Sequence, residues 1–481
     1  MTSFWQHVFV GLIGSTAGRI VTLVSLAIGA KYFYSPEDIG YWGALLAVAM
    51  FLAPLATWRY ELSIVLPSSD QVARKLNLGL MTLVVIATVL VTLLVIYWPK
   101  EHLASILSSY ELVLIIPALV FFQNIRKGAE YWLVRIKEFR TVAFLDFSSA
   151  LLMALTTLGA GYFFTSEIKI FSVASFVAIL LASVLYVYCA GRLKLFSSVG
   201  YSELKNSFRS LSEYAVYPKY VTPYSLSLGL NQHAFTMALS YFYGAALTGA
   251  FVIAYRLVFA PVLLLVTPLR QVFFSHGKVI NGSMSLETRE QLTNILSFLV
   301  WTIPALAVAA SVFVDYAILW FFGEKYSEAA KISSIVIYAA FANIVTGWMD
   351  RIYDLLGRQR LSVALQVVAD VLIFGTVILL MVNNFTALQV ITAFTVLMLM
   401  YEFIWLLITL RISELNPELI RKLALVLVIV SGGFYFVHKM LFSVLGNNFM
   451  SILVFVAVAA SWCMLQLYFH FDKIRAASLK Q

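Results

Sequence analysis

Charged residues are scarce in this chain. Asp, Glu, Lys and Arg together make up 12% of its 481 residues, and 62% of the residues are hydrophobic. A soluble domain carries about 25% charged residues, so the composition excludes an ordinary soluble protein and indicates an integral membrane protein. Strands with alternating polar and apolar residues are also lacking. Helices, rather than a barrel, are therefore expected to cross the membrane.

Cysteine is equally rare. The two cysteines, Cys189 and Cys463, lie within apolar runs, and the sequence has neither a C-x-x-C motif nor a cluster of histidines and cysteines. We therefore expect no disulfide, no metal site and no cofactor. The N-terminus lacks the basic segment that begins a signal peptide, so the first apolar run is expected to stay in the protein.

Fourteen apolar helices are predicted. Each is long enough for a tilted membrane span. Their approximate ranges are 7–30, 41–58, 77–98, 111–134, 142–164, 170–190, 220–243, 248–273, 293–315, 330–355, 362–383, 386–410, 421–438 and 448–470.

The net charge is +9, and its basic residues are concentrated in the loops between these helices. If the N-terminus is cytoplasmic, most of the 33 lysines and arginines fall in cytoplasmic loops, helix ends or the C-terminal tail. The outer side then holds Lys31, Lys100, Lys169, Lys325, Lys331 and Lys439. Because cytoplasmic loops carry an excess of Lys and Arg, both termini are predicted to be cytoplasmic. Membrane topology thus explains the excess of basic residues, and no nucleic-acid partner is expected.

Two motifs occur twice, in the same order. The first is Tyr32-Phe33-Tyr34 before Gly40, repeated as Tyr241-Phe242-Tyr243 before Gly249; the second is Asn124-Ile125-x-x-Gly128, repeated as Asn343-Ile344-x-x-Gly347. The copies lie six helices apart, which predicts two parallel repeats related by an axis along the membrane normal. The predicted domains are an N-terminal six-helix lobe (1–195), a cytoplasmic linker (196–214), a C-terminal six-helix lobe (215–411) and two further helices with a cytoplasmic tail (412–481).

A polar stretch, residues 123–130, interrupts the fourth predicted helix. It contains Arg126 and Lys127, where the second repeat has Val345 and Thr346. The repeat architecture therefore does not require these cations, and ionisable groups inside a span suggest a functional site. We expect both to bind an anionic substrate. Two alternatives remain: an ion pair between Arg126 and Glu130, one helical turn apart, or a topology signal at the inner mouth.

Other ionisable residues also fall inside or beside predicted helices. Arg19 and Arg256 lie near the middle of their helices, and Lys219 lies at the inner end of the seventh. We predict that they bind substrate, the alternative being that their long side chains reach the interface. The acids of the spans either pair with cations or take up a coupling ion, H⁺ or Na⁺. The candidates for coupling are Glu61, Asp146, His233 and Asp370, and the acids Glu130 and Glu402 also lie in spans.

Two stretches resemble a known family. Tyr34-Ser-Pro-Glu-Asp-Ile-Gly and Trp58-Arg-Tyr-Glu-Leu-Ser-Ile-Val-Leu-Pro are similar to the bacterial Wzx-type polysaccharide (O-antigen) flippases, and the likeness continues through 131–140, 248–256 and 319–326. The resemblance implies the fold of the MATE-like flippase superfamily, with two six-helix lobes around a central cavity. It also assigns Arg19 and Arg256 to that cavity.

The same resemblance implies the function. The substrate would be an undecaprenyl-diphosphate-linked oligosaccharide, moved by alternating access from the cytoplasmic to the periplasmic leaflet of the bacterial inner membrane. A polymerase or ligase would then take it. Arginine suits such a headgroup because its planar fork bonds two phosphate oxygens at once. A multidrug or cation antiporter and a lipid II flippase of the same superfamily remain alternatives. A membrane enzyme is excluded, since no outer loop is long enough to carry a catalytic site.

Overall fold

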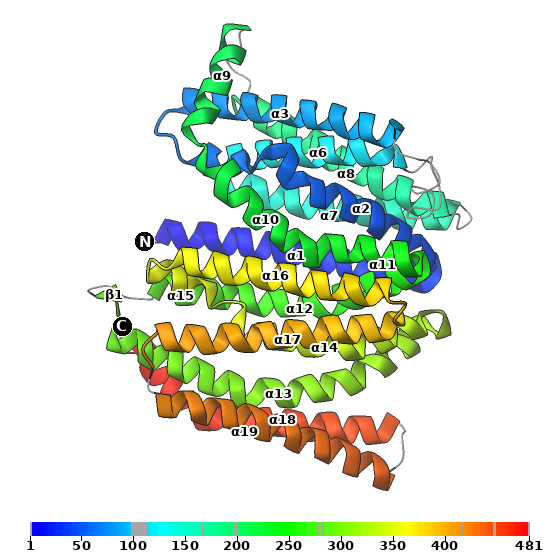
Figure 1. Cartoon of the computed structure of the whole chain (residues 1–481), viewed down its shortest axis with the longest axis vertical. Helices are drawn as coiled ribbons and strands as arrows, with labels where there is room; N and C mark the ends of the chain where they lie inside the picture. Colours follow the sequence, from blue (N-terminus) through cyan, green and yellow to red (C-terminus); the bar gives the residue numbers. More distant parts are fainter. Residues whose placement is uncertain are drawn as a thin grey trace. The chain divides into compact units, whose positions relative to one another are not determined.

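The computed structural model describes residues 2–97, 113–164, 168–195, 201–276, 279–280, 283–415, 417–445 and 449–479. Nearly all of them are helical (Figure 1). The strands in these ranges are β1 (Val279–Ile280) and β2 (Ser283–Met284), which form one short antiparallel pair. The predicted class, an all-α membrane protein, is confirmed. Ten helices of the described chain are long and apolar enough to cross a membrane.

The contacts divide the chain into two compact units, residues 1–252 and 253–481, with the boundary inside α12 (Ala245–His276). This boundary differs from the predicted boundary between the two repeats, because it is defined by which segments pack together and not by the repeated motifs. The other helices of unit 1 are α1 (Thr2–Tyr32), α2 (Pro36–Thr57), η1 (Tyr60–Val65), α3 (Asp70–Tyr97), α6 (Ile115–Arg135), α7 (Phe139–Phe163), α8 (Ile168–Arg192), α9 (Tyr201–Glu213), η2 (Tyr217–Val221), α10 (Thr222–Gly229), η3 (Leu230–Ala234) and α11 (Phe235–Tyr243).

Unit 2 is helical in the same way. Beyond the end of α12 it contains α13 (Leu286–Phe322), η4 (Glu324–Tyr326), α14 (Ser327–Thr346), α15 (Asp350–Leu355), α16 (Gln359–Val382), α17 (Ala387–Ile412), α18 (Pro417–Leu445) and α19 (Phe449–Leu479). The C-terminal pair packs on α13, where Phe434 and Phe455 join a buried cluster with Val308. The Trp462 indole N–H donates to the Trp301 carbonyl at 2.8 Å and fixes α19 on this surface.

Each of the fourteen predicted helices has a counterpart. Two expectations need correction. The predicted helix 330–355 is interrupted after Thr346, and α15 resumes at Asp350. The predicted polar linker also contains a helix, α9, which packs on α3 through Leu211 against Gly79. Residues 196–200 of that linker and the predicted helix limits at 98, 111 and 448 lie outside the described residues.

The turn between α1 and α2 is closed by local chemistry. Ser35 caps α2 in a capping box with Asp38, and Pro36 occupies the first turn, where a missing N–H costs nothing. The buried Tyr34 hydroxyl donates to the Thr157 carbonyl of α7 at 2.6 Å. Burial, aided by the nearby Asp38 carboxylate, raises the pKa of Tyr34 to about 12. The first motif of the repeat therefore anchors α1 and α2 on α7.

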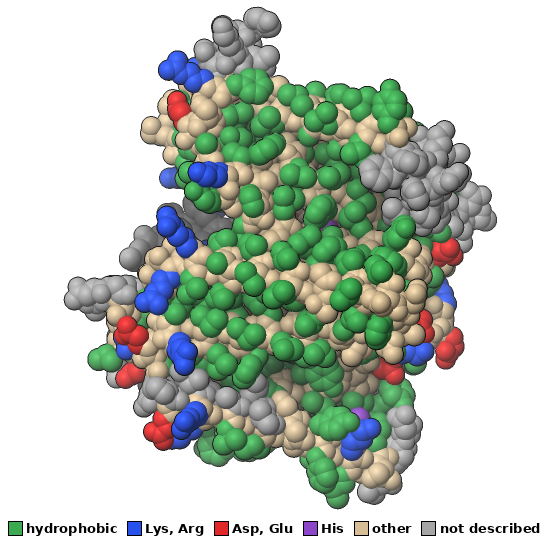
Figure 2. Space-filling model, in the orientation of Figure 1, with side chains coloured by type: hydrophobic (Ala, Val, Ile, Leu, Met, Phe, Trp, Pro, Cys, Tyr) green, Lys and Arg blue, Asp and Glu red, His purple; other side chains and the backbone are tan. Residues whose placement is uncertain are grey.

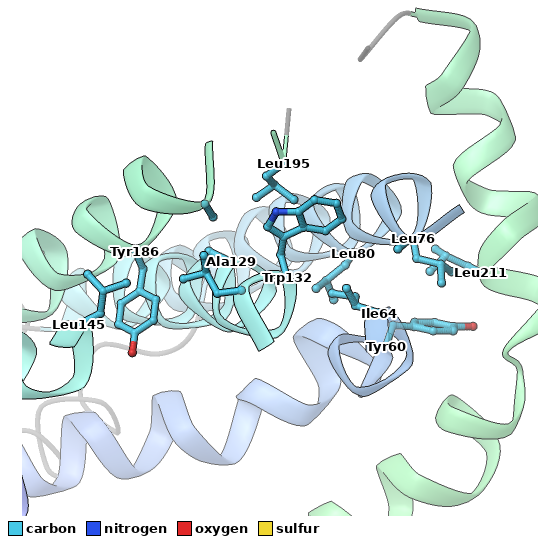
Figure 3. Packing of buried hydrophobic residues seen from close by; sticks show 13 residues of the cluster. Tyr60, Ile64, Leu76, Leu80, Ala129, Trp132, Leu145, Tyr186, Leu195 and Leu211 are labelled. Carbon is cyan, nitrogen blue, oxygen red and sulfur yellow. The ribbon is translucent and has the colours of Figure 1, made fainter. Parts of the chain in front are cut away.

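The buried core of unit 1 surrounds α6 (Figure 3). Ala129 and Trp132 of α6 pack with Leu76 and Leu80 of α3, and Tyr186 of α8 joins the same cluster. The Trp132 indole N–H donates to the Leu193 carbonyl at 3.1 Å, so this large ring is both buried and satisfied. The core thus holds in place the helix that carries the predicted polar stretch.

The seventh predicted helix is not regular. It is continuous from Tyr217 to Tyr243 but contains two π-helical turns, η2 and η3. Pro223 explains the first turn, because proline has no N–H to continue the α-helical pattern; Thr222 N–H bonds the Tyr217 carbonyl instead. The second turn contains Asn231, Gln232 and His233, the polar residues in the middle of this helix. Such π turns are frequent at functional sites.

The surface agrees with a membrane location. On the visible face, hydrophobic side chains cover the lengths of the helices, and Lys, Arg, Asp and Glu gather near helix ends (Figure 2). Leu90 of α3 and Leu155 of α7 are 60% and 61% exposed. A soluble protein buries such faces, whereas lipid tails solvate them.

Candidate functional site

The predicted polar stretch belongs to a larger cluster of charges in unit 1. We call it the polar cluster. Its members come from η1 and the turn before it, α6 and α7. They are Arg59, Glu61, Arg126, Lys127, Glu130 and Asp146. Tertiary folding therefore brings together two predicted substrate residues and two predicted coupling residues.

Arg126 pairs with Asp146, not with Glu130. Its Nη2 donates to Asp146 Oδ1 at 3.2 Å, and its guanidinium lies over the Tyr186 ring, 4.5 Å from the ring centre. The Tyr186 hydroxyl donates to the same carboxylate oxygen at 2.6 Å. The alternative of an ion pair within α6 is therefore wrong, and the pair that forms joins α6 to α7. A cation over an aromatic face is electrostatically favourable, and the buried Tyr186 fixes both partners.

Asp146 sits where α1 comes close to α7. A Cβ added at Gly18 would lie 3.4 Å from the Asp146 carbonyl oxygen, which is tighter than most such contacts. The neighbouring side chain, Arg19, is exposed on α1 and forms no hydrogen bond or ion pair within the described ranges. It was predicted to bind substrate, and no hydrogen bond or ion pair among the described residues joins it to the polar cluster.

Arg59 and Glu61 are positioned by an unusual turn. Trp58 and Arg59 both have left-handed backbones, with φ of 50° and 57°, which is uncommon for residues other than glycine. This turn directs Arg59 Nη1 to Glu61 Oε1 at 3.0 Å and Arg59 Nε to the Ser225 hydroxyl of α10 at 2.8 Å. Glu61 is fully buried, and its second oxygen, Oε2, has no hydrogen-bond partner among the described residues.

Lys127 lies in the middle of the cluster without a direct partner. Its charge interacts with those of Glu61 and Glu130, and with those of Arg59 and Arg126, yet no hydrogen bond or ion pair within the described chain engages its ammonium group. The side chain is half-buried. Such an ammonium group is able to accept an anionic ligand without first breaking an ion pair.

His233 lies within electrostatic range of Lys127. It is half-buried in the π turn η3, which packs against α2. The third predicted coupling residue therefore lies near the polar cluster. The fourth, Asp370, belongs to unit 2: it is buried in α16 and accepts a hydrogen bond from Gln366 at 2.9 Å.

The repeated asparagine and glycine of α6 serve the architecture. The Asn124 amide donates to the Val120 carbonyl of its own helix at 2.7 Å. The Gly128 carbonyl accepts from the Asn77 amide of α3 at 3.0 Å, and a Cβ at Gly128 would meet Asn77 Oδ1 at 2.8 Å. This glycine is needed for the close approach of α3.

Two further cations were predicted to bind substrate. Arg256, in unit 2, is half-buried and forms no hydrogen bond or ion pair with any described residue. Lys219, in η2, is exposed, and its ammonium lies 5.3 Å from the ring centre of the adjacent Tyr220. Arg256 is thus available to an anion inside its span, whereas Lys219 lies on the surface of its unit.

Two other arginines have guanidinium groups that bond to the protein itself, and they serve as a comparison for Arg126. The Arg135 guanidinium donates to the carbonyls of Ile64 and Pro67 and pairs with Asp70 at 2.9 Å. Arg270 donates to the Gly347 carbonyl at 2.6 Å and pairs with Asp350. These side chains are engaged by the protein itself. Arg126 instead uses one hydrogen bond of a group that has five N–H donors.

Sequence reasoning missed two members of this region. Tyr186 and Ser225 orient Asp146 and Arg59, but both residues are distant in sequence from their partners. Tyrosine and serine in apolar helices are too common to signal such a role. Arg59 was counted only among the cytoplasmic basic residues that indicate topology. Its position two residues before Glu61 was the sequence signal that could have identified the pair.

The cluster combines one buried and two half-buried acids with cations whose donors are partly unused by the described residues. That arrangement can bind phosphate oxygens through Arg126 and Lys127, because charge-assisted hydrogen bonds to phosphate are among the strong ones.

Comparisons with known proteins identify the family and the fold of the chain. The model of a family described as polysaccharide biosynthesis protein matches residues 33–331. Among curated proteins, none matches the sequence. The solved structure of the lipid II flippase MurJ in an inward closed conformation is similar over 97% of this chain and 100% of its own, with a TM-score of 0.69 and 15% identity.

Two other structures share the fold. An inward-facing multidrug resistance MATE family transporter of the MOP superfamily has a TM-score of 0.52 at 13% identity, covering 84% of this chain and 94% of its own. A MOP superfamily transporter from Pyrococcus furiosus, whose binding pocket is described as having reverse polarity, has a TM-score of 0.55 at 12% identity, covering 85% and 95%. At these identities the likeness establishes the fold, which this chain shares with the three structures.

Proposed function

This chain belongs to the polysaccharide biosynthesis protein family, and on that premise we propose that it is a flippase for lipid-linked oligosaccharides. The substrate is an undecaprenyl-diphosphate-linked repeat unit of O-antigen or a similar polysaccharide. The protein moves it by alternating access from the cytoplasmic to the periplasmic leaflet of the bacterial inner membrane, with both of its own termini cytoplasmic. A polymerase or ligase then uses the product.

One observation carries the proposal: cations of the helices α6 and α12 have hydrogen-bonding capacity that no described residue uses. Lys127 and Arg256 have no direct partner in the described chain, and Arg126 has one. A buried, unpaired charge is costly. A diphosphate offers acceptor oxygens to these donors, so the substrate itself can engage the N–H groups that the described residues leave unused.

The physical demands of the substrate agree with this reading. Each bare hydroxyl of a sugar costs roughly 2–7 kcal/mol to transfer into an apolar medium, and a phosphate charge costs far more. The transporter must replace the water around the headgroup with polar side chains during the passage. The polar cluster of unit 1 offers such groups on α6 and α7, where the second repeat has Val345 and Thr346 in place of the cations.

Reconstitution tests the proposal. Purified protein in liposomes that contain labelled undecaprenyl-diphosphate-linked oligosaccharide should make the label accessible on the opposite leaflet. Lys127→Ala should reduce the rate at least tenfold, because it removes the unpaired ammonium, and Lys127→Arg should retain most of it. Loss of about 1.4 kcal/mol of substrate interaction corresponds to a tenfold change.

Arg140→Ala is the matched control, since Arg140 is an exposed cation at the start of α7. If Lys127 were only a topology signal, both alanine variants would act alike, through the amount of inserted protein. Equal flipping per inserted molecule in Lys127→Ala and the wild type would refute the role of Lys127. A wild-type protein that does not move the lipid at all would refute the function.

Ion coupling is a further part of the proposal. Glu61, Asp146, His233 and Asp370 are the candidates, with H⁺ or Na⁺ as the coupling ion. A buried carboxylate such as Glu61, with one oxygen free of hydrogen bonds among the described residues, is able to take up a cation. Imposing each gradient separately on the same liposomes tests both ions, and flipping indifferent to both rejects coupling.

A lipid II flippase is the second candidate, favoured by the structural likeness to MurJ. The diphosphate chemistry would be the same, so the assay must compare the two lipids in competition. Preference for lipid II would reassign the substrate. A multidrug or cation antiporter predicts instead gradient-driven uptake of a cationic dye, which the unpaired cations Lys127 and Arg256 should disfavour.

A further inference from the structure

A further buried acid site lies in unit 2. Glu402 of α17 is 7% exposed and faces the last turn of α14. The Asn343 amide donates to its Oε1 at 3.1 Å, and the Thr346 hydroxyl is hydrogen-bonded to its Oε2. No Lys or Arg of the described chain forms an ion pair with it. A carboxylate in a span without a counter-ion requires another way to be neutralised.

The hydrogen-bond geometry accommodates two protonation states. Thr346 Oγ1 lies within hydrogen-bonding distance of Glu402 Oε2 and also 3.1 Å from the Ala342 carbonyl. When Glu402 is ionised, the Thr346 hydroxyl donates to Oε2. When a proton from water binds Oε2, the new O–H donates to Thr346 Oγ1, and the threonine hydrogen turns to the Ala342 carbonyl. Asn343 keeps its bond to Oε1 in both states.

We propose that Glu402 is a proton-binding site, and that its protonation reverses a hydrogen bond on the last turn of α14 and so couples proton uptake to transport; the coupling rests on the function proposed above. The proton is favoured over a metal cation because both partners of the carboxylate are donors. Hard cations need several oxygen ligands instead.

The location gives the proton a mechanical consequence. Thr346 is the last residue of α14, and the chain turns before α15 begins at Asp350. Arg270 of α12 donates to the Gly347 carbonyl in this turn. Arg270 and Glu402 therefore both hold the interruption, Arg270 through Gly347 and Glu402 through the last turn of α14. The first repeat differs, since Asn124 bonds to its own helix and α6 continues without a break.

Few titratable groups face Glu402. On α12 the Tyr255 hydroxyl interacts with it electrostatically. On α16 the nearest acid, Asp370, is bonded to Gln366, which accepts from Tyr401 beside Glu402 at 2.5 Å. On α14 the facing groups, Asn343 and Thr346, do not titrate. Changes in pH at this position therefore report mainly on Glu402.

Infrared difference spectroscopy of the detergent-solubilised full chain tests proton binding without any lipid-linked sugar. One component of the protonated-carboxyl absorption should appear as the pH falls and should be absent from the spectrum of Glu402→Gln, whose amide preserves both hydrogen bonds. Glu328→Gln, in the exposed first turn of α14 where Glu328 pairs with Lys331, is the matched control and should retain the band. Thr346→Ser should keep the titration midpoint, and Thr346→Val should move it.

Transport measurements provide the second test of the proposal. Flipping by the wild type should respond to an imposed pH gradient, and flipping by Glu402→Gln should not. A Glu402 band that does not titrate, or a Thr346→Val midpoint equal to the wild type, overturns the two-state site. A titrating band combined with an unchanged gradient response in Glu402→Gln overturns the coupling. Absence of flipping in the wild type refutes the proposed function, while the infrared result still decides the proton site.

Discussion

Gly40 and Gly249 pack against each other's helix backbone, and the contact is reciprocal. A Cβ on Gly40 would lie 1.8 Å from the Ala245 carbonyl oxygen, and a Cβ on Gly249 would lie 1.6 Å from the Pro36 carbonyl oxygen. Pro36 and Ala245 are separated by the same number of residues as the two glycines. Reciprocal contacts of this kind result from a two-fold relation. The two copies of the first motif therefore meet at equivalent positions.

Replacement of either glycine should destabilise this contact. Gly40→Ala or Gly249→Ala forces two backbones apart, and overpacking of this kind typically costs about 1–3 kcal/mol. The expected result is a lower melting temperature in detergent and less folded protein. Gly159→Ala is the control, because a Cβ at Gly159 in α7 would meet no atom within 4 Å. Equal melting temperatures for Gly40→Ala and Gly159→Ala would contradict the close contact.

Removal of Arg59 should destabilise unit 1 through Glu61. Arg59→Ala leaves the fully buried carboxylate without its direct ion pair, and breaking a buried pair by removing one partner costs about 3–5 kcal/mol. We expect poor recovery of folded protein in size-exclusion chromatography. The double variant Arg59→Ala/Glu61→Gln should recover a large part of the loss, since the orphaned charge is gone.

The cycle is completed by Glu61→Gln alone and by Ser225→Ala, which removes only the hydroxyl that accepts from Arg59. Ser225→Ala should cost about 1 kcal/mol or less. If the double variant is no better than Arg59→Ala, the damage comes from lost packing of the arginine and not from the carboxylate.

Exchange of Arg126 and Asp146 separates a structural ion pair from a substrate contact. Arg126→Asp/Asp146→Arg keeps opposite charges at the two positions and should fold, but it moves the cation from α6 to α7. If Arg126 binds the diphosphate, flipping should remain at least tenfold below the wild type. Recovery of flipping in the exchanged protein would show that the pair serves the architecture alone. Arg126→Lys should lose the stacking on Tyr186, worth roughly 0.5–2 kcal/mol.

The Tyr34 hydroxyl should make stability depend on alkaline pH. Its pKa is raised from 10.0 to about 12, so the neutral phenol is favoured in the folded protein. This contribution is present below pH 10 and is lost as the pH rises from 10 to about 12, because the unfolded chain ionises first. Melting temperatures measured across that interval should fall more steeply for the wild type than for Tyr34→Phe.

At neutral pH, Tyr34→Phe should itself cost about 0.5–1.5 kcal/mol, because the buried hydrogen bond to the Thr157 carbonyl is lost. Tyr162→Phe, an exposed tyrosine at the end of α7, is the control and should change neither the melting temperature nor its pH dependence. A wild-type profile parallel to that of Tyr34→Phe would contradict the predicted ionisation.

The positions of the helices were predictable because lipid imposes one rule on every span. Backbone groups must be bonded within the helix and side chains must be apolar over its length, so hydropathy alone located all fourteen segments. The break after Thr346 and the π turn at Asn231–His233 were not predictable. Both depend on bonds to other helices, such as that of Arg270 with Gly347, and these bonds leave no local pattern.

The sequence by itself determined the membrane class, the family resemblance, the repeated motifs and the candidate polar residues. Only the tertiary structure decided which charges meet. It paired Arg126 with Asp146, twenty residues away in sequence, left Lys127 without a direct partner in the described chain, and placed Glu402 between Asn343 and Thr346. The physical reason is that hydropathy is a property of one helix at a time. An ion pair depends instead on which surfaces of two helices come into contact when the helices pack.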